Sequence, residues 1–262
     1  MKPLVEVDRV SKVFEKDGRT VEALREVSFD VRRGELLALI GASGCGKSTL
    51  LNLMGGLLMP SAGEIRYDGA PVRDVNTRMG YITQHDTLLP WRTVEGNVRI
   101  ALELKGLSAA EQAERARAMI RRVGLAEFER HYPHELSGGM RKRVGLARAL
   151  VYDPEALLMD EPFGALDAQL RVVMQGELLR IWEASGKTIV FVTHDLDEAL
   201  VLSDRIVVLS RRPGRLKAIV DVALPRPRDI NGVRYLPEYR DLHARLWDLL
   251  KDDVLAAAET DR

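Results

Sequence analysis

The stretch that decides the fold runs from Leu36 to Leu57 and reads LLALIGASGCGKSTLLNLMGGL. It opens with a continuous apolar run, which predicts a short buried strand. The leucine-rich run that starts near Lys47 predicts a helix. The loop between them is rich in glycine, which lets successive backbone N–H groups converge on one small anion without a Cβ in the way. The stretch therefore predicts a strand, an anion-binding loop and a helix in direct succession.

The loop fits the pattern Gly-x-x-x-x-Gly-Lys-Ser at Gly41, Gly46, Lys47 and Ser48. Converging N–H groups and the positive end of the following helix favour a phosphate. Lys47 would reach the β- and γ-phosphates, and the hydroxyl of Ser48 would ligate Mg²⁺. We therefore predict a nucleoside triphosphate site, in preference to a glycine-rich turn with a purely structural role. The residues assigned to it are Gly41, Ser43, Gly44, Cys45, Gly46, Lys47, Ser48 and Thr49.

Two acids end a later apolar run. The segment EALLMD ends on Asp160, and Glu161 follows directly. In an open parallel sheet, ligands bind outside the carboxyl ends of the strands, and the phosphate loop also follows such an end. Asp160 is predicted to hold the Mg²⁺ shell in the Walker-B role, and Glu161 to polarise an attacking water as general base. The alternative is that Asp160, Glu161 and Pro162 cap the next helix.

Two further polar residues close predicted strands. The segment KTIVFVTHD ends on His194 and Asp195, and GYITQ ends on Gln84. We predict that His194 contacts the γ-phosphate or the attacking water, although a lone histidine is more often structural. The amide of Gln84 could bridge Mg²⁺ and water, so Gln84 joins Glu161 and His194 as a catalytic candidate and Ser48 and Asp160 as a metal ligand.

The remaining pattern indicates an α/β fold. Short strand-like pieces fill residues 4–40 and continue to about Gln84, and helix formers dominate residues 93–149. The apolar runs after that alternate with helices, which is typical of a parallel sheet covered on both faces. A final helix carries its leucines on one stripe, at Leu242, Leu246, Leu249 and Leu250.

These patterns divide the chain into three parts. We expect a nucleotide-binding core with an antiparallel β subdomain at residues 1–92 and 151–225. A helical subdomain would occupy residues 93–150, and a C-terminal helical extension residues 226–262.

The composition limits the classes of protein that fit. The chain has 262 residues, 46% of them hydrophobic, which is enough for a full core. Lys and Arg total 39 and Asp and Glu total 39, and this zero net charge argues against nucleic acid as a partner. A single cysteine, Cys45, excludes an internal disulfide and a cysteine-based zinc cluster. Because no signal region or apolar run of roughly 18–20 residues is present, we expect a cytosolic protein that reaches a membrane only through a partner.

Taken in order, these motifs resemble those of the ATPase subunits of ATP-binding cassette (ABC) transporters, over roughly residues 4–225. The resemblance implies a P-loop nucleoside triphosphate hydrolase core of mostly parallel sheet, an N-terminal antiparallel β subdomain and an inserted helical subdomain. It also implies that LSGGM is the family's signature stretch and that Phe14 stacks on adenine; the alternative for Phe14 is a buried ring at a strand end. The matching segments are Gly41–Ser48, Gln84, Leu136–Met140, Asp160-Glu161, Leu166-Asp167 and His194.

Two longer segments, QHDTLLPWRTVEGNV from Gln84 and DEPFGALDAQLR from Asp160, are similar to importers of nitrate, sulfonates and taurine. The tail LPRPRD is similar to that group as well. Such a resemblance implies a peripheral subunit on the cytoplasmic face of the inner membrane, docked on transmembrane permease subunits near Gln84–Trp91 and served indirectly by a substrate-binding protein. The alternative for this docking segment is an ordinary apolar corner. Met140 and Lys142 depart from the glutamines of the broad family, which leaves their contacts unassigned.

The resemblance also implies a mechanism. Two copies of the chain would sandwich two ATP–Mg²⁺, each held by the phosphate loop of one copy and by Ser137, Gly138 and Gly139 of the other. Asp167 would cross-link the two sites. Three cations at positions 141–143 occupy the first helical turn, where a helix favours anions, and whether they contact nucleotide stays open.

Other classes of ATPase remain as alternatives. A non-transport member of the same superfamily would act on nucleic acid or the ribosome, but zinc-binding cysteine pairs, long coiled-coil arms and a second cassette are all missing. An unrelated phosphate-loop kinase or GTPase has no use for LSGGM. A cassette that binds ATP without hydrolysing it is opposed by Glu161 and His194. The sequence does not identify the transported solute.

Overall fold

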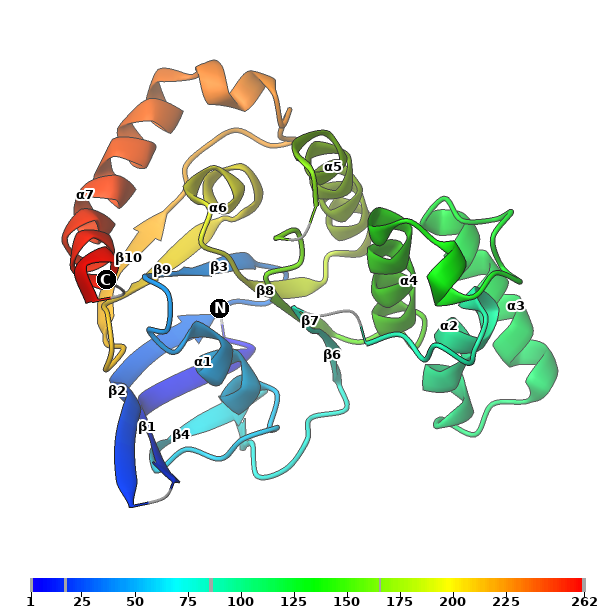
Figure 1. Cartoon of the computed structure of the whole chain (residues 1–262), viewed down its shortest axis with the longest axis horizontal. Coiled ribbons are helices and arrows are strands. Elements are labelled where there is room, and N and C mark those ends of the chain that lie inside the picture. Colours follow the sequence, from blue (N-terminus) through cyan, green and yellow to red (C-terminus); the bar gives the residue numbers. More distant parts are fainter. Residues whose placement is uncertain (1, 17, 85–86, 165, 261–262) are drawn as a thin grey trace. The chain divides into compact units, whose positions relative to one another are not determined.

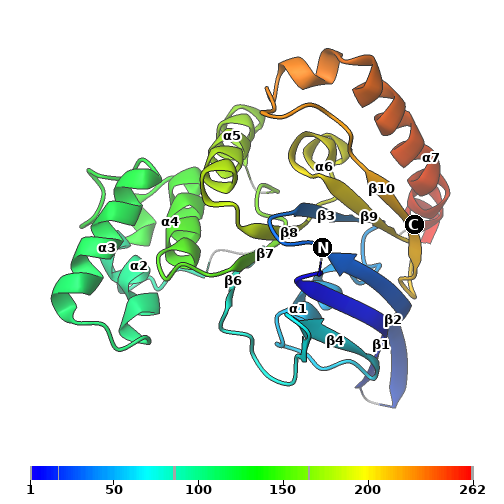
Figure 2. The same ribbon diagram turned by 180° about the vertical axis from the view of Figure 1, so that it is seen from behind.

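The computed structural model describes residues 2–16, 18–84, 87–164 and 166–260. The chain divides into two compact units, seen from opposite sides in Figures 1 and 2. The first unit comprises residues 1–76 and 179–262, and the second comprises residues 77–178. Within the described residues, no helix combines the length and apolar character that crossing a bilayer requires.

The first unit begins with an antiparallel sheet. Its strands are β1 (Val5–Lys16), β2 (Arg19–Val31), β4 (Ala62–Tyr67) and β5 (Ala70–Pro71), in the order β2-β1-β4-β5. The buried positions at the end of β2 alternate with more exposed ones, which is typical of a sheet with one face against the core. The antiparallel N-terminal piece implied by the family resemblance is therefore confirmed. Asp17, the first residue of a predicted turn, lies outside the described residues.

The same unit contains the parallel strands that carry the phosphate loop. Strand β3 (Leu36–Ile40) runs parallel to both β8 (Thr188–Val192) and β9 (Arg205–Leu209), and β10 (Leu216–Asp221) pairs with β9 in antiparallel fashion. Every residue of β3, β8 and β9 is buried, as continuous apolar runs predict. Helices α1 (Lys47–Met54) and α6 (Leu196–Leu202) lie on opposite sides of these strands (Figure 1).

The C-terminal residues add a helix to the first unit. After a short 3-10 turn, η2 (Gly232–Tyr235), helix α7 (Pro237–Thr260) runs beside α6 (Figures 1 and 2). Leu246 is fully buried and Leu250 is 5% exposed. The predicted leucine stripe is thus the face by which α7 packs on its own unit.

The second unit combines a pair of strands with helices. Strands β6 (Met79–Ile82) and β7 (Ala156–Asp160) pair in parallel. The helices are α2 (Val94–Glu103), α3 (Ala109–Arg122), the 3-10 turn η1 (Pro133–Glu135), α4 (Gly138–Leu150) and α5 (Ala168–Ser185), whose last residues belong to the first unit. The predicted helical character of residues 93–149 is therefore confirmed.

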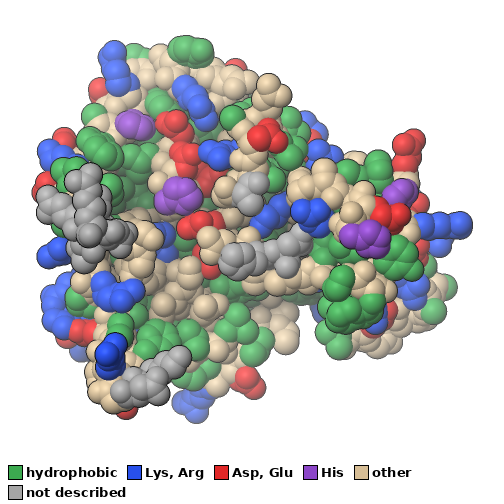
Figure 3. Space-filling model, in the orientation of Figure 1, with side chains coloured by type: hydrophobic (Ala, Val, Ile, Leu, Met, Phe, Trp, Pro, Cys, Tyr) green, Lys and Arg blue, Asp and Glu red, His purple; other side chains and the backbone are tan. Residues whose placement is uncertain are grey.

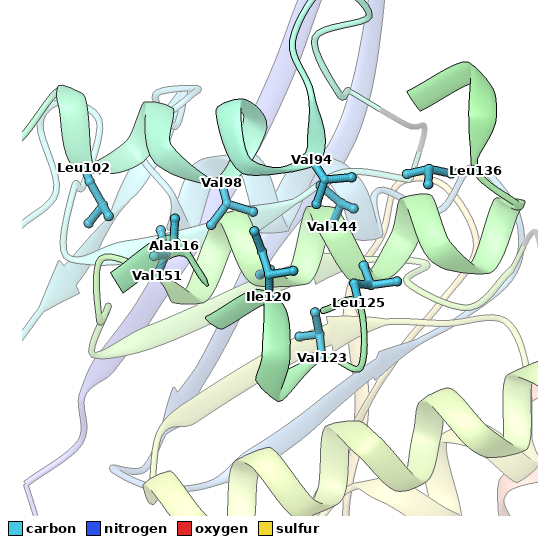
Figure 4. Packing of buried hydrophobic residues seen from close by; sticks show 11 residues of the cluster. Val94, Val98, Leu102, Ala116, Ile120, Val123, Leu125, Leu136, Val144 and Val151 are labelled. Carbon is cyan, nitrogen blue, oxygen red and sulfur yellow. The ribbon is translucent and has the colours of Figure 1, made fainter. Parts of the chain in front are cut away.

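A shared hydrophobic cluster holds α2, α3 and α4 together (Figure 4). Ala116 and Ile120 of α3 and Val98 of α2 are fully buried in it, and Val144 brings in α4. The spacing of these side chains along each helix places them on one face, so their burial follows from helical periodicity. This packing sets the position of the first turn of α4, where the signature stretch lies.

Candidate functional site

In the first unit, the phosphate loop is closed around its lysine. Lys47 is only 6% exposed, and its Nζ donates hydrogen bonds to the carbonyl oxygens of Gly41 (2.8 Å) and Ala42 (3.1 Å). Gly46 has φ +103°, and a Cβ there would lie 2.7 Å from Cδ2 of Leu24. Only glycine fits that position. The loop thus holds a buried cation at the start of α1, as an anion site requires.

Helix α1 begins without a side-chain cap. The N-cap residue is Gly46, which has no side chain to accept a hydrogen bond from the first turn. That turn contains no acidic residue. Ser43, Gly44 and Ser48 are exposed at the same place. The positive end of the helix dipole is therefore left for an anion, and the exposed Ser48 hydroxyl is placed beside it.

Cys45 contributes to the loop by packing and backbone. Its side chain is fully buried, and burial raises the pKa of the thiol above its ordinary value. The thiol therefore stays protonated at neutral pH, and it is not a reactive group. Contact of Cys45 with a nucleotide would thus come from its backbone N–H.

A contact to the loop that the sequence did not reveal comes from the turn between β9 and β10. Nε of Arg212 donates a hydrogen bond to the carbonyl oxygen of Gly44 at 3.2 Å. Gly214 packs so tightly that a Cβ would lie 2.1 Å from the carbonyl oxygen of Cys45. The Pro-Gly pair in RRPGR could have marked the turn, but nothing in the sequence placed that turn against the phosphate loop.

His194 lies in the same unit as the phosphate loop. It is exposed and follows β8, while the loop follows β3, which pairs with β8 in parallel. Thr193 Oγ1 accepts a hydrogen bond from the backbone N–H of Asp195 (3.1 Å), and Asp195 in turn caps α6 by accepting from Glu198 N–H (3.1 Å). The structure thus brings Lys47 and His194 to the same edge of the sheet, as predicted from the strand ends.

In the second unit, Glu161 has an unusual backbone. It follows β7 with φ +45°, a left-handed conformation that is costly for a residue with a Cβ. Its Oε2 accepts a hydrogen bond from Nε2 of Gln84 at 2.9 Å. Asp160 is 8% exposed. Backbone strain of this kind is concentrated at active sites, where it fixes the direction of a side chain. It therefore fits a catalytic role for Glu161.

The alternative reading of the acids as a helix cap is wrong. The next helix, α5, begins at Ala168, and residues 161–164 form a turn. The cap of α5 is instead Asp167, whose Oδ1 accepts a hydrogen bond from the backbone N–H of Leu170 at 2.9 Å. Asp167 is exposed.

The signature stretch begins α4. Ser137 is the N-cap, and its hydroxyl accepts a hydrogen bond from Met140 N–H at 3.3 Å. Ser137 and Gly138 are exposed, while Gly139 is buried. A Cβ on Gly139 would lie 2.2 Å from Cδ2 of Leu170, so this helix start is pressed onto α5. The backbone at 138 and 139 therefore tolerates little displacement.

Because α4 begins at Gly138, Lys142 and Arg143 lie in its second turn and not in the first turn as predicted. Arg141 and Lys142 bind carbonyl oxygens of their own unit. Nη1 of Arg141 donates to the carbonyl of Leu136 at 2.6 Å, and Nζ of Lys142 donates to the backbone carbonyl of Gln84 at 2.7 Å. Lys142 thereby joins α4 to the residue that bonds Glu161. This contact was not predicted, because it joins residues 58 positions apart in the sequence.

Phe14 is not the buried ring of the alternative reading. It is 37% exposed, and Nζ of Lys12 lies 5.2 Å from the ring centroid. The ring is therefore accessible for stacking.

The segment predicted to dock on a permease forms a firm corner. Asn97 is fully buried, its Oδ1 accepts from Leu89 N–H at 2.7 Å, and its Nδ2 donates to Leu89 O at 3.1 Å and to Arg92 O at 3.0 Å. Leu88 packs against the helical cluster, while Trp91 is 71% exposed. His85 and Asp86 of this segment lie outside the described residues.

The predicted Mg²⁺ ligands are oxygen donors. No group of three His, Cys, Asp or Glu suited to a metal occurs among the described residues. Mg²⁺ does not need one, since it commonly takes one or two protein oxygens together with substrate phosphates and waters. The hydroxyl of Ser48, the carboxylate of Asp160 and the amide oxygen of Gln84 fit that chemistry.

Comparison with known proteins identifies the family of the chain. Residues 24–164 match the ABC transporter family. A taurine import ATP-binding protein of Rhizobium johnstonii is 43% identical over 262 residues, covering 97% of this chain and 100% of the relative. An aliphatic sulfonates import ATP-binding protein of Bacillus cereus is 46% identical, covering 86% of this chain and 88% of the relative.

A solved structure shares the fold. It is a dimeric ATP-binding cassette in a post-hydrolysis state, bound to ADP and phosphate, with 32% sequence identity and a TM-score of 0.75. The match covers 83% of this chain and 98% of that one, and it confirms the predicted P-loop hydrolase fold. The chain therefore belongs to the ABC transporter family, as an ATPase whose hydrolysis is coupled to transport.

Proposed function

We propose that this chain powers a membrane importer for taurine, a sulfonate, nitrate or a related small anion. The observation that carries the proposal is similarity along nearly the whole chain, C-terminal helix included, to a taurine import ATP-binding protein. The relatives' names favour import over action on nucleic acid or the ribosome.

The ATP would bind the first unit through the phosphate loop. Lys47 contacts the β- and γ-phosphates, backbone N–H groups from Gly41 to Thr49 surround them, and Phe14 stacks on adenine. Ser48, Asp160 and Gln84 would hold Mg²⁺, which would supply positive charge to neutralise the charge that develops on the phosphoryl oxygens.

A second copy of the chain would complete each site. Its Ser137 hydroxyl and the N–H groups of Gly138 and Gly139 face the γ-phosphate, and Asp167 cross-links the two sites. The dimeric cassette with ADP and phosphate supports such an arrangement by analogy. Because ATP binds the closed dimer more tightly than the open one, closure and reopening can drive the permease between two states.

Hydrolysis would then use residues aimed at the γ-phosphate. Glu161 accepts a proton from the attacking water, and His194 holds that water and the γ-phosphate in line. The left-handed backbone of Glu161 and its hydrogen bond from Gln84 support this role, because they restrict the carboxylate to one direction.

The chain would transmit the energy of ATP hydrolysis to the permease at the cytoplasmic face of the inner membrane. The exposed ring of Trp91, on the corner held by Asn97, would insert between permease segments, which would receive a substrate-binding protein on their other side. Its exposure supports this placement, since large exposed aromatic side chains commonly anchor protein interfaces.

The catalytic proposal is tested with Glu161→Gln. We expect ATP binding to persist, turnover to fall by about 10²–10⁴-fold as for a lost general base, and an ATP-dependent dimer to appear by light scattering. The matched control is Glu155→Gln, which removes an exposed ion pair with Arg78 (2.8 Å) just before the same strand and should leave turnover unchanged. Parent-like turnover in Glu161→Gln would exclude Glu161 as the base.

The shared-site proposal has its own test. Subunits carrying Ser137→Arg mixed with subunits carrying Lys47→Ala should form some dimers with one intact composite site, and these should retain activity. If the mixture has no more activity than its parts, each chain holds a complete site. Growth of a deletion strain on taurine, alkanesulfonates or nitrate then identifies the solute.

A further inference from the structure

We propose that the C-terminal extension, here residues 226–260, positions His194 by holding helix α6 at both ends. The proposal rests on the function proposed for His194 and concerns how that side chain is kept in place. Asp195, directly after His194, is the N-cap of α6, so the position of the helix sets the position of the histidine.

The extension holds the first turn of α6 through Asp197. The hydroxyl of Tyr239 donates a hydrogen bond to Asp197 Oδ1 at 2.5 Å, and Tyr239 is only 6% exposed. Two cationic or ionisable groups approach the same carboxylate: Arg234 Nη1 at 3.9 Å from Oδ2 and His243 Nε2 at 3.8 Å from Oδ1. Burial and the bond to Asp197 raise the pKa of Tyr239, which keeps its hydroxyl a donor.

The extension also binds the last turn of α6. The final carbonyl groups of a helix have no partner within the helix. Nη1 of Arg228 donates to the carbonyls of Leu200 (3.0 Å), Val201 (3.2 Å) and Ser203 (2.5 Å). Arg228 is 8% exposed, and burial lowers its pKa to about 10, which leaves it charged at neutral pH.

A second arginine adds to this end. Nη2 of Arg226 donates to the carbonyl of Leu202 at 2.7 Å and to Asp204 Oδ1 at 2.8 Å. Its guanidinium lies 4.3 Å from the ring centroid of Trp182. The two arginines come from the tail LPRPRD, whose role the proposed mechanism leaves unassigned.

Helix α6 needs such support. It has seven residues, and helices this short are not stable by themselves in water. His194 is exposed. Figures 1 and 2 show α7 passing beside α6, and in Figure 3 acidic, basic and histidine side chains gather over this part of the unit. Together with the burial of residues 198–202, the bonds at its two ends fix the helix that directly follows His194 and Asp195.

The decisive variant is Tyr239→Phe, which removes one hydroxyl and little else. We expect kcat for ATP hydrolysis by the full chain to fall about tenfold with KM for ATP unchanged, since small displacements of a catalytic group lower the rate steeply. Asp197→Ala removes the acceptor of that bond and should show the same split, and adding Tyr239→Phe to it should lower kcat no further because the bond is already lost.

The matched control is Asp253→Asn. Asp253 also lies on α7, but it pairs with Lys217 of β10 at 2.9 Å rather than with α6. Its loss should leave kcat and KM unchanged. All rates are divided by the folded fraction measured by circular dichroism. If Tyr239→Phe does not fold, the comparison of Arg228→Lys with Arg228→Ala tests the other end of α6.

Epistasis separates positioning from general stabilisation. In a His194→Ala background, Tyr239→Phe should cause no further loss of the residual rate. Unchanged kcat in Tyr239→Phe and Asp197→Ala, or an undiminished effect without His194, would overturn the proposal. Parent-like turnover in His194→Ala would instead overturn the role of His194 itself, so the two failures are distinct.

Discussion

Two helix N-termini, one in each unit, invite comparison. Helix α1 follows the phosphate loop and α4 follows Ser137, and neither has an acidic residue in its first turn. Helices α2, α3 and α6 do have acids there, which is the usual complement to a helix dipole. Both α1 and α4 thus leave their positive ends for an anion from elsewhere.

The two ends differ in what they add to the dipole. Helix α1 has a buried lysine in its loop and no side-chain cap. Helix α4 is capped by Ser137, and its first cations, Arg141 and Lys142, bond to carbonyls of their own unit. In the proposed function, α1 would therefore bind the phosphate through a charge and its dipole, whereas α4 would add only a hydroxyl and backbone donors to a phosphate that is already bound.

The largest expected effect falls on the α1 side. Lys47→Ala should weaken ATP binding about a hundredfold, since hydrogen bonds to a charged group contribute about 1.5–3 kcal/mol. Titration calorimetry measures the dissociation constant. Lys105→Ala is the control, because Lys105 also donates to a carbonyl, that of Tyr152, but lies in the second unit. Equal affinities in the two variants would mean that the α1 site is not the phosphate site.

The next effect concerns the geometry of α4. In Gly139→Ala, the new Cβ meets Leu170 at 2.2 Å, so the helix start must shift. We expect turnover to fall at least about tenfold while ATP binding stays unchanged, because the role proposed for α4 is limited to a phosphate that is already bound.

Gly145→Ala is the control for this variant. It lies on the same helix, and nothing lies within 4 Å of the added Cβ. It should keep turnover and add about 0.5–1 kcal/mol of stability, measured by urea unfolding. If the double variant Gly139→Ala with Leu170→Ala recovers turnover, the clash between the two side chains is the cause. A loss of ATP affinity in Gly139→Ala would contradict the different roles proposed for α1 and α4.

A smaller effect separates capping from ligand binding at Ser137. Ser137→Ala should lower the free energy of unfolding by about 1 kcal/mol, since an N-cap is lost. Ser137→Asp should keep that stability, because aspartate caps well, yet it should reduce turnover by placing a negative charge beside the phosphate. Denaturation and ATPase assays on both variants give the answer, and parallel changes in the two assays would assign Ser137 to structure alone.

The smallest effect is expected at Lys142. Its Nζ already donates to the carbonyl of Gln84, so Lys142→Met should change the dissociation constant of ATP by less than about twofold. A tenfold weakening would show that Lys142 contacts the nucleotide and would remove the contrast with α1.

Much of the fold followed from local pattern. The strands Leu36–Ile40, Ala156–Asp160 and Thr188–Val192 are apolar except for Asp160 and Thr188, and all of their residues are buried. Because the end of a strand is marked by the local sequence, the polar residues that follow these strands could be predicted as site candidates from the sequence. The same holds for the leucines of α7, whose helical period predicted the buried face.

Contacts between distant positions could not be predicted in that way. The bond from Arg212 to Gly44 joins residues 168 apart, and the bond from Tyr239 to Asp197 joins residues 42 apart. A single sequence carries no signal that brings such positions together. These positions meet only when the loops and helices pack against the sheet that they cover.

The sequence by itself determined the phosphate loop, the strand ends that carry the acids and the histidine, and the family to which they belong. Three features depended on the tertiary structure alone. They are the left-handed backbone of Glu161, the hydrogen bonds of Arg141 and Lys142 to carbonyl oxygens of their own unit, and the hydrogen bonds between the C-terminal extension and α6. The physical reason is range: propensity and periodicity act over a few neighbouring residues, whereas hydrogen bonds and burial depend on which segments meet in space.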